Sequence, residues 1–74
     1  MELREALGLN VRRIRQARGL STEALANTVG LSYSYVGEIE RGRRNPSLSV
    51  LEMLANGLGV PPHRLLDPTW SSNL

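Results

Sequence analysis

The sequence predicts an all-α fold of five short helices, at about residues 3–18, 22–29, 33–41, 48–58 and 62–66. Two observations support this prediction. Apolar residues recur three and four positions apart, which is the spacing of one face of a helix. Serine, glycine and proline stand where these patterns begin and end, as residues that cap or stop helices do.

Length and composition restrict what the chain can be. At 74 residues it has room for one domain, which we assign to residues 1–66, followed by a tail at 67–74. A core of this size is marginal, and without cysteine neither disulfides nor cysteine-type zinc sites can supplement it. No apolar run approaches the length of a membrane span, and the first residues do not form a signal peptide. We therefore expect a cytoplasmic location.

The first helix combines an apolar stripe with charged and small residues. Gly8 costs about 1 kcal/mol relative to alanine inside a helix, so close packing is expected there. Leu9 is off the stripe and is expected to be exposed or to lie in a dimer contact. Arg15 is tipped toward the interior, where a lone charge is rare. The stripe consists of Leu3, Leu7, Val11 and Ile14.

Residues 21–42 read as two helices joined by a tight turn. Ser21 and Ser32 are good N-cap residues, because a hydroxyl can accept a bond from a free N–H group of the first turn. Gly30 can adopt the left-handed conformation that ends the first of these helices. Two apolar pairs have the spacing of hydrophobic staples, Leu20 with Leu25 and Leu31 with Val36.

The helix at 33–41 has two different faces. Val36 and Ile39 point inward together, and Glu40 is tipped inward beside them. The outward face is polar, with a small residue in its middle, and lacks the usual helix-favouring surface residues. This composition favours contact with a partner over a purely solvated helix. The outward residues are Tyr33, Ser34, Gly37, Glu38 and Arg41.

The last two helices supply the remaining core and a surface for self-association. Ser47 can cap the fourth helix, and Pro61-Pro62 opens the fifth, which Val60 and Leu65 can staple. In the tail, Trp70 is a possible anchor. The buried stripe of the fourth helix is Leu48, Leu51, Leu54, Ala55 and Leu58. A second apolar strip on that helix, with the fifth helix, predicts a homodimer interface formed by Val50, Met53, Gly57, Leu65 and Leu66.

Positive charge is concentrated although the net charge is only +2, and all nine basic residues are arginine. One cluster lies at residues 12–18, and a second, at 41–44, follows the third helix. The planar fork of arginine suits phosphates and guanine edges. His63 is the one histidine, and the carboxylates form no evident pair in an apolar pocket. We therefore predict no enzymatic activity, cofactor, metal or small-molecule ligand.

These features, in this order and spacing, resemble the Cro/cI phage-repressor family of DNA-binding domains, also called Xre-like. The resemblance runs from about Leu7 to Leu66. Its central residues are Ala26, Gly30, Val36 and the run Ile39-Glu40-Arg41-Gly42. Tyr35-Val36-Gly37 followed by that run is similar in particular to the controller proteins of restriction–modification systems. The resemblance implies a compact lambda-repressor-like fold, an ion pair between Arg15 and Glu40, and a transcriptional regulator, often a repressor.

The resemblance also implies which residues contact double-stranded DNA. The third helix would enter the major groove, with bases contacted by Tyr33, Ser34 and Glu38. Phosphates would be contacted by Thr22, Tyr35, Arg41, Arg43, Arg44 and Asn45. For Arg12 and Arg18 two interpretations are equally supported: a phosphate contact, or an ordinary solvated side chain. Thr22 and Ala24 depart from the glutamine and glutamate that the family often has.

Two functions follow as hypotheses. The first is a sequence-specific regulator that binds an inverted-repeat operator as a homodimer. The second is a protein-interaction module on the same scaffold, such as an antitoxin or a subunit that docks a partner. Three arginines within residues 41–44 favour the first hypothesis, because a protein contact has less need of them.

Overall fold

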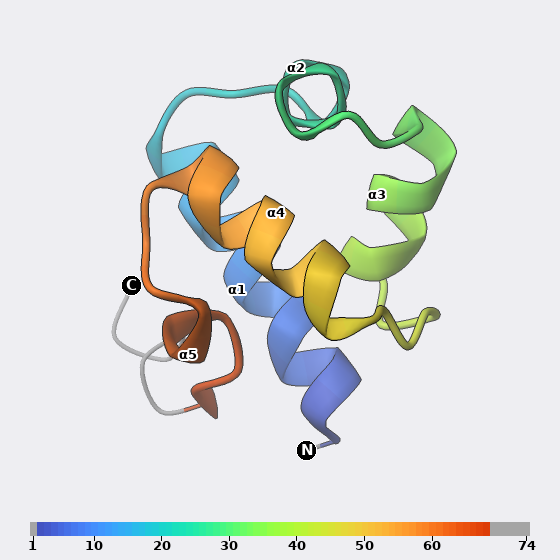
Figure 1. Ribbon diagram of the computed structural model, residues 1–74, viewed down its shortest axis with the longest axis vertical. Helices are drawn as coiled ribbons and strands as arrows, with labels where there is room; N and C mark the ends of the chain where they lie inside the picture. Colours follow the sequence, from blue (N-terminus) through green and yellow to red (C-terminus); the bar gives the residue numbers. More distant parts are fainter. Residues whose placement is uncertain (1, 69–74) are drawn as a thin grey trace.

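Five helices surround one apolar core in the computed structural model, which describes residues 2–68 (Figure 1). They are α1 (Leu3–Ala17), α2 (Thr22–Val29), α3 (Tyr33–Glu40), α4 (Leu48–Leu58) and α5 (Pro62–Leu65). The five predicted helices are confirmed, and their ends differ from the prediction by one residue at most. Trp70 lies outside the described residues. No helix in the described part of the chain is both long and apolar enough to cross a membrane.

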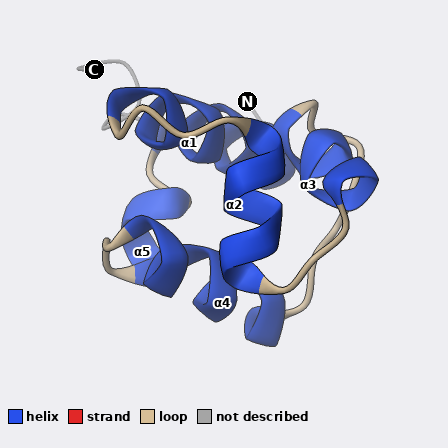
Figure 2. Ribbon diagram, turned by 90° about the horizontal axis from the view of Figure 1, so that it is seen from above, coloured by secondary structure: helices blue, strands red, loops and turns tan. Residues whose placement is uncertain are grey.

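The helices pack around α1 and α4, which cross each other in Figure 1. α1 also contacts α3 and α5, and α2 contacts α3 and α4. Seen from above in Figure 2, α2 lies across the other helices with α3 beside it. Every helix contributes to the core, which consists of Leu7, Val11, Ile14, Leu25, Ala26, Val29, Val36, Ile39, Leu51, Leu54, Ala55, Leu58 and Leu65.

Local hydrogen bonds fix where the helices begin and end. Ser21, Ser32 and Ser47 each accept a hydrogen bond from the backbone N–H three residues later, at 3.0–3.2 Å. Each hydroxyl thereby satisfies one of the donors that a helix start leaves open. Gly30 ends α2 with a φ of 75°, the left-handed conformation that glycine adopts most easily. These caps set the turn between α2 and α3.

Two glycines allow helices to approach each other closely. A Cβ atom at Gly8 would lie 2.5 Å from the carbonyl oxygen of Ile39, so α1 and α3 could not pack as they do. A Cβ atom at Gly57 would clash with Cγ1 of Val29, on α2. The missing side chain of Gly57 serves packing within the chain, where α4 meets α2. Because Gly57 is only half-buried, its place in a dimer interface stays a prediction.

Asn10 attaches the end of α5 to α1. Its side chain is fully buried, and the two hydrogens of Nδ2 are shared among the carbonyl oxygens of Arg64 (3.1 Å), Leu65 (2.8 Å) and Asp67 (3.0 Å). These bonds satisfy carbonyl groups at a helix end that lack a partner within the helix. Leu65 itself is 0% exposed. Its side chain has no surface to offer a second copy, so the prediction that it lines a dimer interface is wrong.

Candidate nucleic-acid interface

A polar hollow of about 370 Å³ lies where α1, the start of α2 and the outward face of α3 meet. Elements that are far apart in the sequence thus bring arginines, hydroxyls and a tyrosine together. The hollow is lined by Arg12, Arg15, Thr22, Tyr33, Ser34, Gly37, Glu40 and Arg41. Four of the residues predicted to contact DNA are among them, namely Thr22, Tyr33, Ser34 and Arg41.

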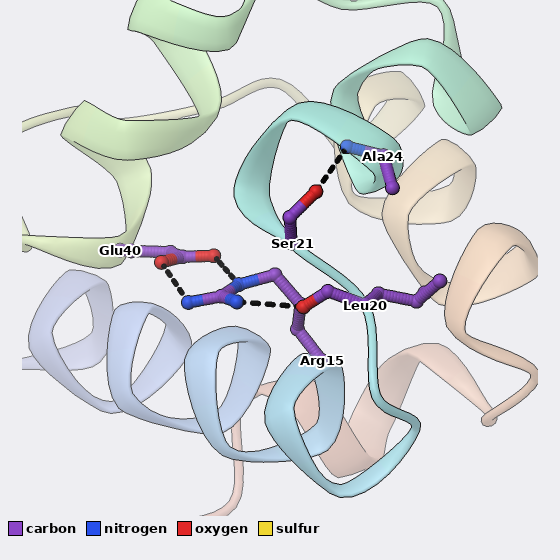
Figure 3. A network of polar contacts seen from close by, with 5 residues as sticks. All are labelled: Arg15, Leu20, Ser21, Ala24 and Glu40. Carbon is purple, nitrogen blue, oxygen red and sulfur yellow. Dashed lines mark hydrogen bonds and ion pairs between the residues drawn. The ribbon is translucent and has the colours of Figure 1, made fainter.

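An ion pair between two lining residues, Arg15 and Glu40, connects the elements around the hollow (Figure 3). Arg15 donates from Nε to Oε2 of Glu40 at 2.7 Å and from Nη2 to Oε1 at 3.1 Å. Its third nitrogen, Nη1, donates to the carbonyl oxygen of Leu20 at 2.8 Å. Leu20 immediately precedes Ser21, the residue that caps α2, so one guanidinium connects α1, α3 and the entry to α2. The predicted ion pair is present, and its role is to build the frame of the site.

Several lining residues of the hollow carry hydrogen-bonding groups that can meet a ligand. Tyr33 is 62% exposed and Ser34 is also exposed, both in the first turn of α3. Thr22 is the first residue of α2, where backbone N–H groups lack partners within the helix. These groups form a surface that can contact both a phosphate and base edges.

Two arginines supply the charge that remains available at this surface. Arg41 folds back along α3, with Nη1 3.3 Å from the position that a Cβ atom of Gly37 would occupy. The small residue in the middle of α3 therefore leaves room for a guanidinium group. Arg12 approaches from α1 and is exposed. The sequence left its role open, yet its spacing of three from Arg15 indicates the same helix face.

Three predicted contact residues form a cluster beside the hollow. Arg44 donates from Nε to Oε1 of Glu38 at 3.0 Å, and its Nη2 lies 2.9 Å from the same oxygen. The guanidinium carbon is 5.4 Å from the centre of the Tyr35 ring. The backbone N–H of Arg43 donates to the carbonyl oxygen of Glu38 at 3.0 Å. This backbone bond belongs to the cap that ends α3, in which Gly42 has a φ of 72° and turns the chain so that Arg44 reaches Glu38.

The other residues predicted to contact phosphates do not line the polar hollow. The side chain of Arg43 is exposed beside the cluster. Asn45 borders a different, apolar hollow between α1 and α4. Arg18 donates from Nε to the carbonyl oxygen of Leu58, where a cation favours the negative end of the α4 dipole. Its side chain thus stabilises the end of α4, while Arg18 stays exposed.

The apolar hollow has a volume of about 150 Å³ and contains the most exposed leucines of the described chain. Leu3 is 60% exposed and Leu48 is 78% exposed, although the sequence placed both in buried stripes. Each is the first residue of its helix, so no further turn packs beside it. Leu66, predicted at the dimer interface, lines the same hollow. The full lining is Leu3, Arg4, Leu7, Asn45, Pro46, Leu48, Leu51 and Leu66.

The two remaining dimer candidates differ from each other. Met53 is exposed on the outside of α4, as a residue of a contact surface would be. Val50 is half-buried and packs against the core of its own chain. The strip that the sequence predicted along α4 is therefore interrupted.

A glycine turn between two short helices, with a polar outward helix and arginines around it, defines a DNA-binding domain of the helix-turn-helix type. A family model described as a helix-turn-helix domain matches residues 6–67. Because this match covers most of the sequence, the chain belongs to this helix-turn-helix family.

Known proteins agree with this assignment. The chain is 41% identical over 69 residues to the uncharacterized HTH-type transcriptional regulator y4dJ of Sinorhizobium fredii, covering 93% of this chain and 90% of that protein. It is 45% identical to the restriction-modification controller protein C.AhdI from Aeromonas hydrophila, with a TM-score of 0.81 over 84% of this chain and 94% of that one. The regulator SinR, solved in complex with DNA, is 37% identical with a TM-score of 0.79, over 82% and 98% of the two chains. The predicted resemblance to phage-repressor-like regulators and controller proteins is confirmed.

Proposed function

We propose that this chain regulates transcription by placing α3 in the major groove of a specific double-stranded DNA site. The observation that carries the proposal is the polar hollow, in which exposed Tyr33 and Ser34 are flanked by Arg12 and Arg41. Base edges specify the sequence, whereas phosphate contacts fix the position of the protein on the duplex. The hollow offers groups for both tasks on one surface.

Each group has a role that follows from its chemistry. The N–H groups at the start of α2, with the Thr22 hydroxyl, suit a phosphate, because a helix N-terminus attracts anions. The charged forks of Arg12, Arg41 and Arg43 suit the phosphates on either side. Tyr33 and Ser34 stand where α3 would meet the base edges.

We further propose that two copies pair through the apolar hollow between α1 and α4. The recognition helix, α3, contacts only a few base pairs. A dimer presents two such helices and so doubles the contacts to DNA. Exposed Leu3 and Leu48 border this hollow with Leu66, and a monomer would leave these side chains in water. Met53, although exposed, does not line this hollow, so it is not part of the proposed contact. The two recognition helices would then lie about 34 Å apart and face successive major grooves.

Binding-site selection from a random duplex pool, followed by anisotropy titration across salt concentrations, tests the DNA proposal. A regulator of this kind enriches one sequence and binds it about 10³-fold or more tightly than random duplex. Affinity for both duplexes should fall as salt rises, because arginine–phosphate contacts release counterions. A chain that enriches no sequence and shows no salt-dependent binding would instead be a protein-interaction module.

A further inference from the structure

We propose that Arg44 is a positioning residue, which holds the Glu38 carboxylate so that its free oxygen selects cytosine in the major groove. The inference rests on the proposed function, since it requires α3 to face base edges. It assigns a new role to Arg44, which the sequence predicted as one of several phosphate contacts.

The geometry of the pair leaves one carboxylate oxygen unused. Both Nε and Nη2 of Arg44 lie within 3.0 Å of Oε1 of Glu38. The other oxygen, Oε2, accepts no hydrogen bond from residues 2–68. Glu38 is one helical turn beyond Ser34, in a row that borders the polar hollow. A carboxylate in this position therefore offers one acceptor to a ligand while Arg44 occupies the other.

Further contacts restrict the arginine itself. Its guanidinium lies over the Tyr35 ring at 5.4 Å, within the range of a cation–π interaction. The preceding residue, Arg43, is bound through its backbone N–H to the carbonyl oxygen of Glu38. The loop is thus attached to α3 at the same residue by backbone and by side chain. Support of this kind is what holds a recognition side chain in one geometry.

Charge explains why a glutamate on a DNA-facing helix needs this partner. An unpaired carboxylate would be repelled by the phosphates on both sides of the groove. With the Arg44 guanidinium on Oε1, the pair is neutral as a unit, and Oε2 remains an acceptor. In the major groove, guanine and thymine present acceptors at their central edge positions, which would repel this oxygen. Adenine offers a donor next to an acceptor, whereas cytosine offers its N4 donor alone at that position. Cytosine is therefore the base that this group favours.

The test compares binding-site selection and titration for the parent and for Glu38→Gln, Arg44→Ala and Arg44→Lys. The parent should enrich cytosine at one position of each half-site, by about five- to 150-fold over other bases, the range of a good base contact. Glu38→Gln and Arg44→Ala should both lose this preference at the same position and keep the preferences elsewhere. Arg44→Lys, which keeps a charge without the planar fork, should restore part of it.

Two further variants separate positioning from other roles. Arg43→Ala removes a neighbouring charge and should leave the cytosine preference unchanged. Adding Arg44→Ala to Glu38→Gln should change base preference no further, because Arg44 acts through Glu38. All these side chains are at least partly exposed, and thermal melts should show that each variant remains folded.

Three results would overturn the inference. If Arg44→Ala weakened selected and random duplexes equally, Arg44 would be a phosphate contact. If Glu38→Gln and Arg44→Ala left every base preference intact, the pair would have only a structural role. The proposed function of the chain would not be affected by that result. If the parent enriched no sequence at all, the proposed function would fall together with this inference.

Discussion

Arg15 and Glu40 form a two-bond ion pair between α1 and α3, with Nε and Nη2 donating to the two carboxylate oxygens. Their side chains are only 11% and 8% exposed. Because Nη1 of Arg15 also donates to Leu20, all three nitrogens of the guanidinium are engaged within the protein. The pair therefore belongs to the frame of the site, although both residues line the polar hollow.

The first prediction follows from the burial of this pair. Glu40→Ala would leave the Arg15 guanidinium buried without its counter-charge, which costs about 3 kcal/mol when one partner of a buried pair is removed. Thermal and urea unfolding should show this loss. A variant that melts like the parent would contradict the structural role assigned to the pair.

A matched variant separates the charge from the contact. Replacing both residues by methionine removes the charges together and keeps apolar volume at the site. Such exchanges of whole pairs are often neutral or even stabilising, so the double variant should be more stable than Glu40→Ala. Its remaining loss would report the bond from Arg15 to the Leu20 carbonyl.

The second prediction concerns the crossing of α1 and α3 at Gly8. Alanine favours a helix over glycine by about 1 kcal/mol, so local propensity alone predicts a more stable protein. The added Cβ would instead meet backbone oxygens at 2.5 Å and 2.7 Å, and backbone cannot move aside cheaply. We expect Gly8→Ala to lower the free energy of unfolding by about 1–3 kcal/mol, the usual cost of overpacking. The exposed Gln16→Ala on the same helix provides the control and should change stability little.

Helix positions could be predicted from the sequence because local chemistry determines them. Ser21, Ser32 and Ser47 cap helices through bonds that span only three residues. Gly30 ends α2 for a reason that is likewise local. The inward orientation of Arg15 and Glu40 could also be predicted from the sequence, because the 3.6-residue period places each beside apolar positions of its helix. Because lone charges are rarely buried, the two were expected to pair, and the family resemblance implied the same ion pair.

Periodicity identifies the apolar face of a helix but does not predict which element covers that face. The pattern along α4 marks Val50, Met53 and Gly57 as apolar and leaves open whether a helix of the same chain covers them. Gly57 packs closely against Val29 of α2, and Met53 remains exposed. Leu3 and Leu48 fit their stripes by spacing but begin their helices, where no neighbouring turn shields them.

The cluster of Glu38, Arg44 and Tyr35 could not be predicted for a different reason. The cap at Gly42, which ends α3 with a bond from the Arg43 N–H to the Glu38 carbonyl oxygen, is local. The direction that the Arg44 side chain takes after this cap is not determined by spacing or composition. The sequence therefore predicted these residues individually as contacts and missed their association.

The third prediction is that Arg43 contributes to DNA affinity and not to the choice of sequence. Its side chain is exposed, and its charge is free to face a phosphate. Arg43→Ala should weaken binding to the selected site and to random duplex by the same factor. The slope of log K against log salt should fall by about one unit for the lost phosphate contact. A change confined to one base position would show that Arg43 reads sequence instead.

Tyr33 provides the contrasting prediction. It is 62% exposed at the first position of α3 and makes no contact needed for the core. Tyr33→Ala should leave the melting temperature nearly unchanged and alter which bases are enriched at one position. Tyr33→Phe keeps the ring and removes the hydroxyl, so comparison of the two variants separates stacking or methyl contact from hydrogen bonding. If Tyr33→Ala weakened binding to all duplexes equally, Tyr33 would contact the DNA backbone and not the bases.

The last prediction tests the pairing surface with two neighbouring residues of α4. Leu48 is 78% exposed at the edge of the apolar hollow, and Ser49, the next residue, is exposed without lining it. A glutamate at either position lies in the first turn, where a negative charge favours the helix dipole. Both variants should therefore fold. Only Leu48→Glu should place a charge inside the proposed contact between two copies, where it would lack a partner.

Sedimentation and titration should then separate the two variants. At micromolar concentration the parent and Ser49→Glu should sediment as dimers, and Leu48→Glu as a monomer. On an operator with inverted half-sites about 10 base pairs apart, Leu48→Glu should lose the gain from effective concentration, about 10²-fold or more in affinity. Its affinity for an isolated half-site should remain that of the parent, because α3 is unchanged. A parent that sediments as a monomer and binds each selected site as one copy would exclude the dimer.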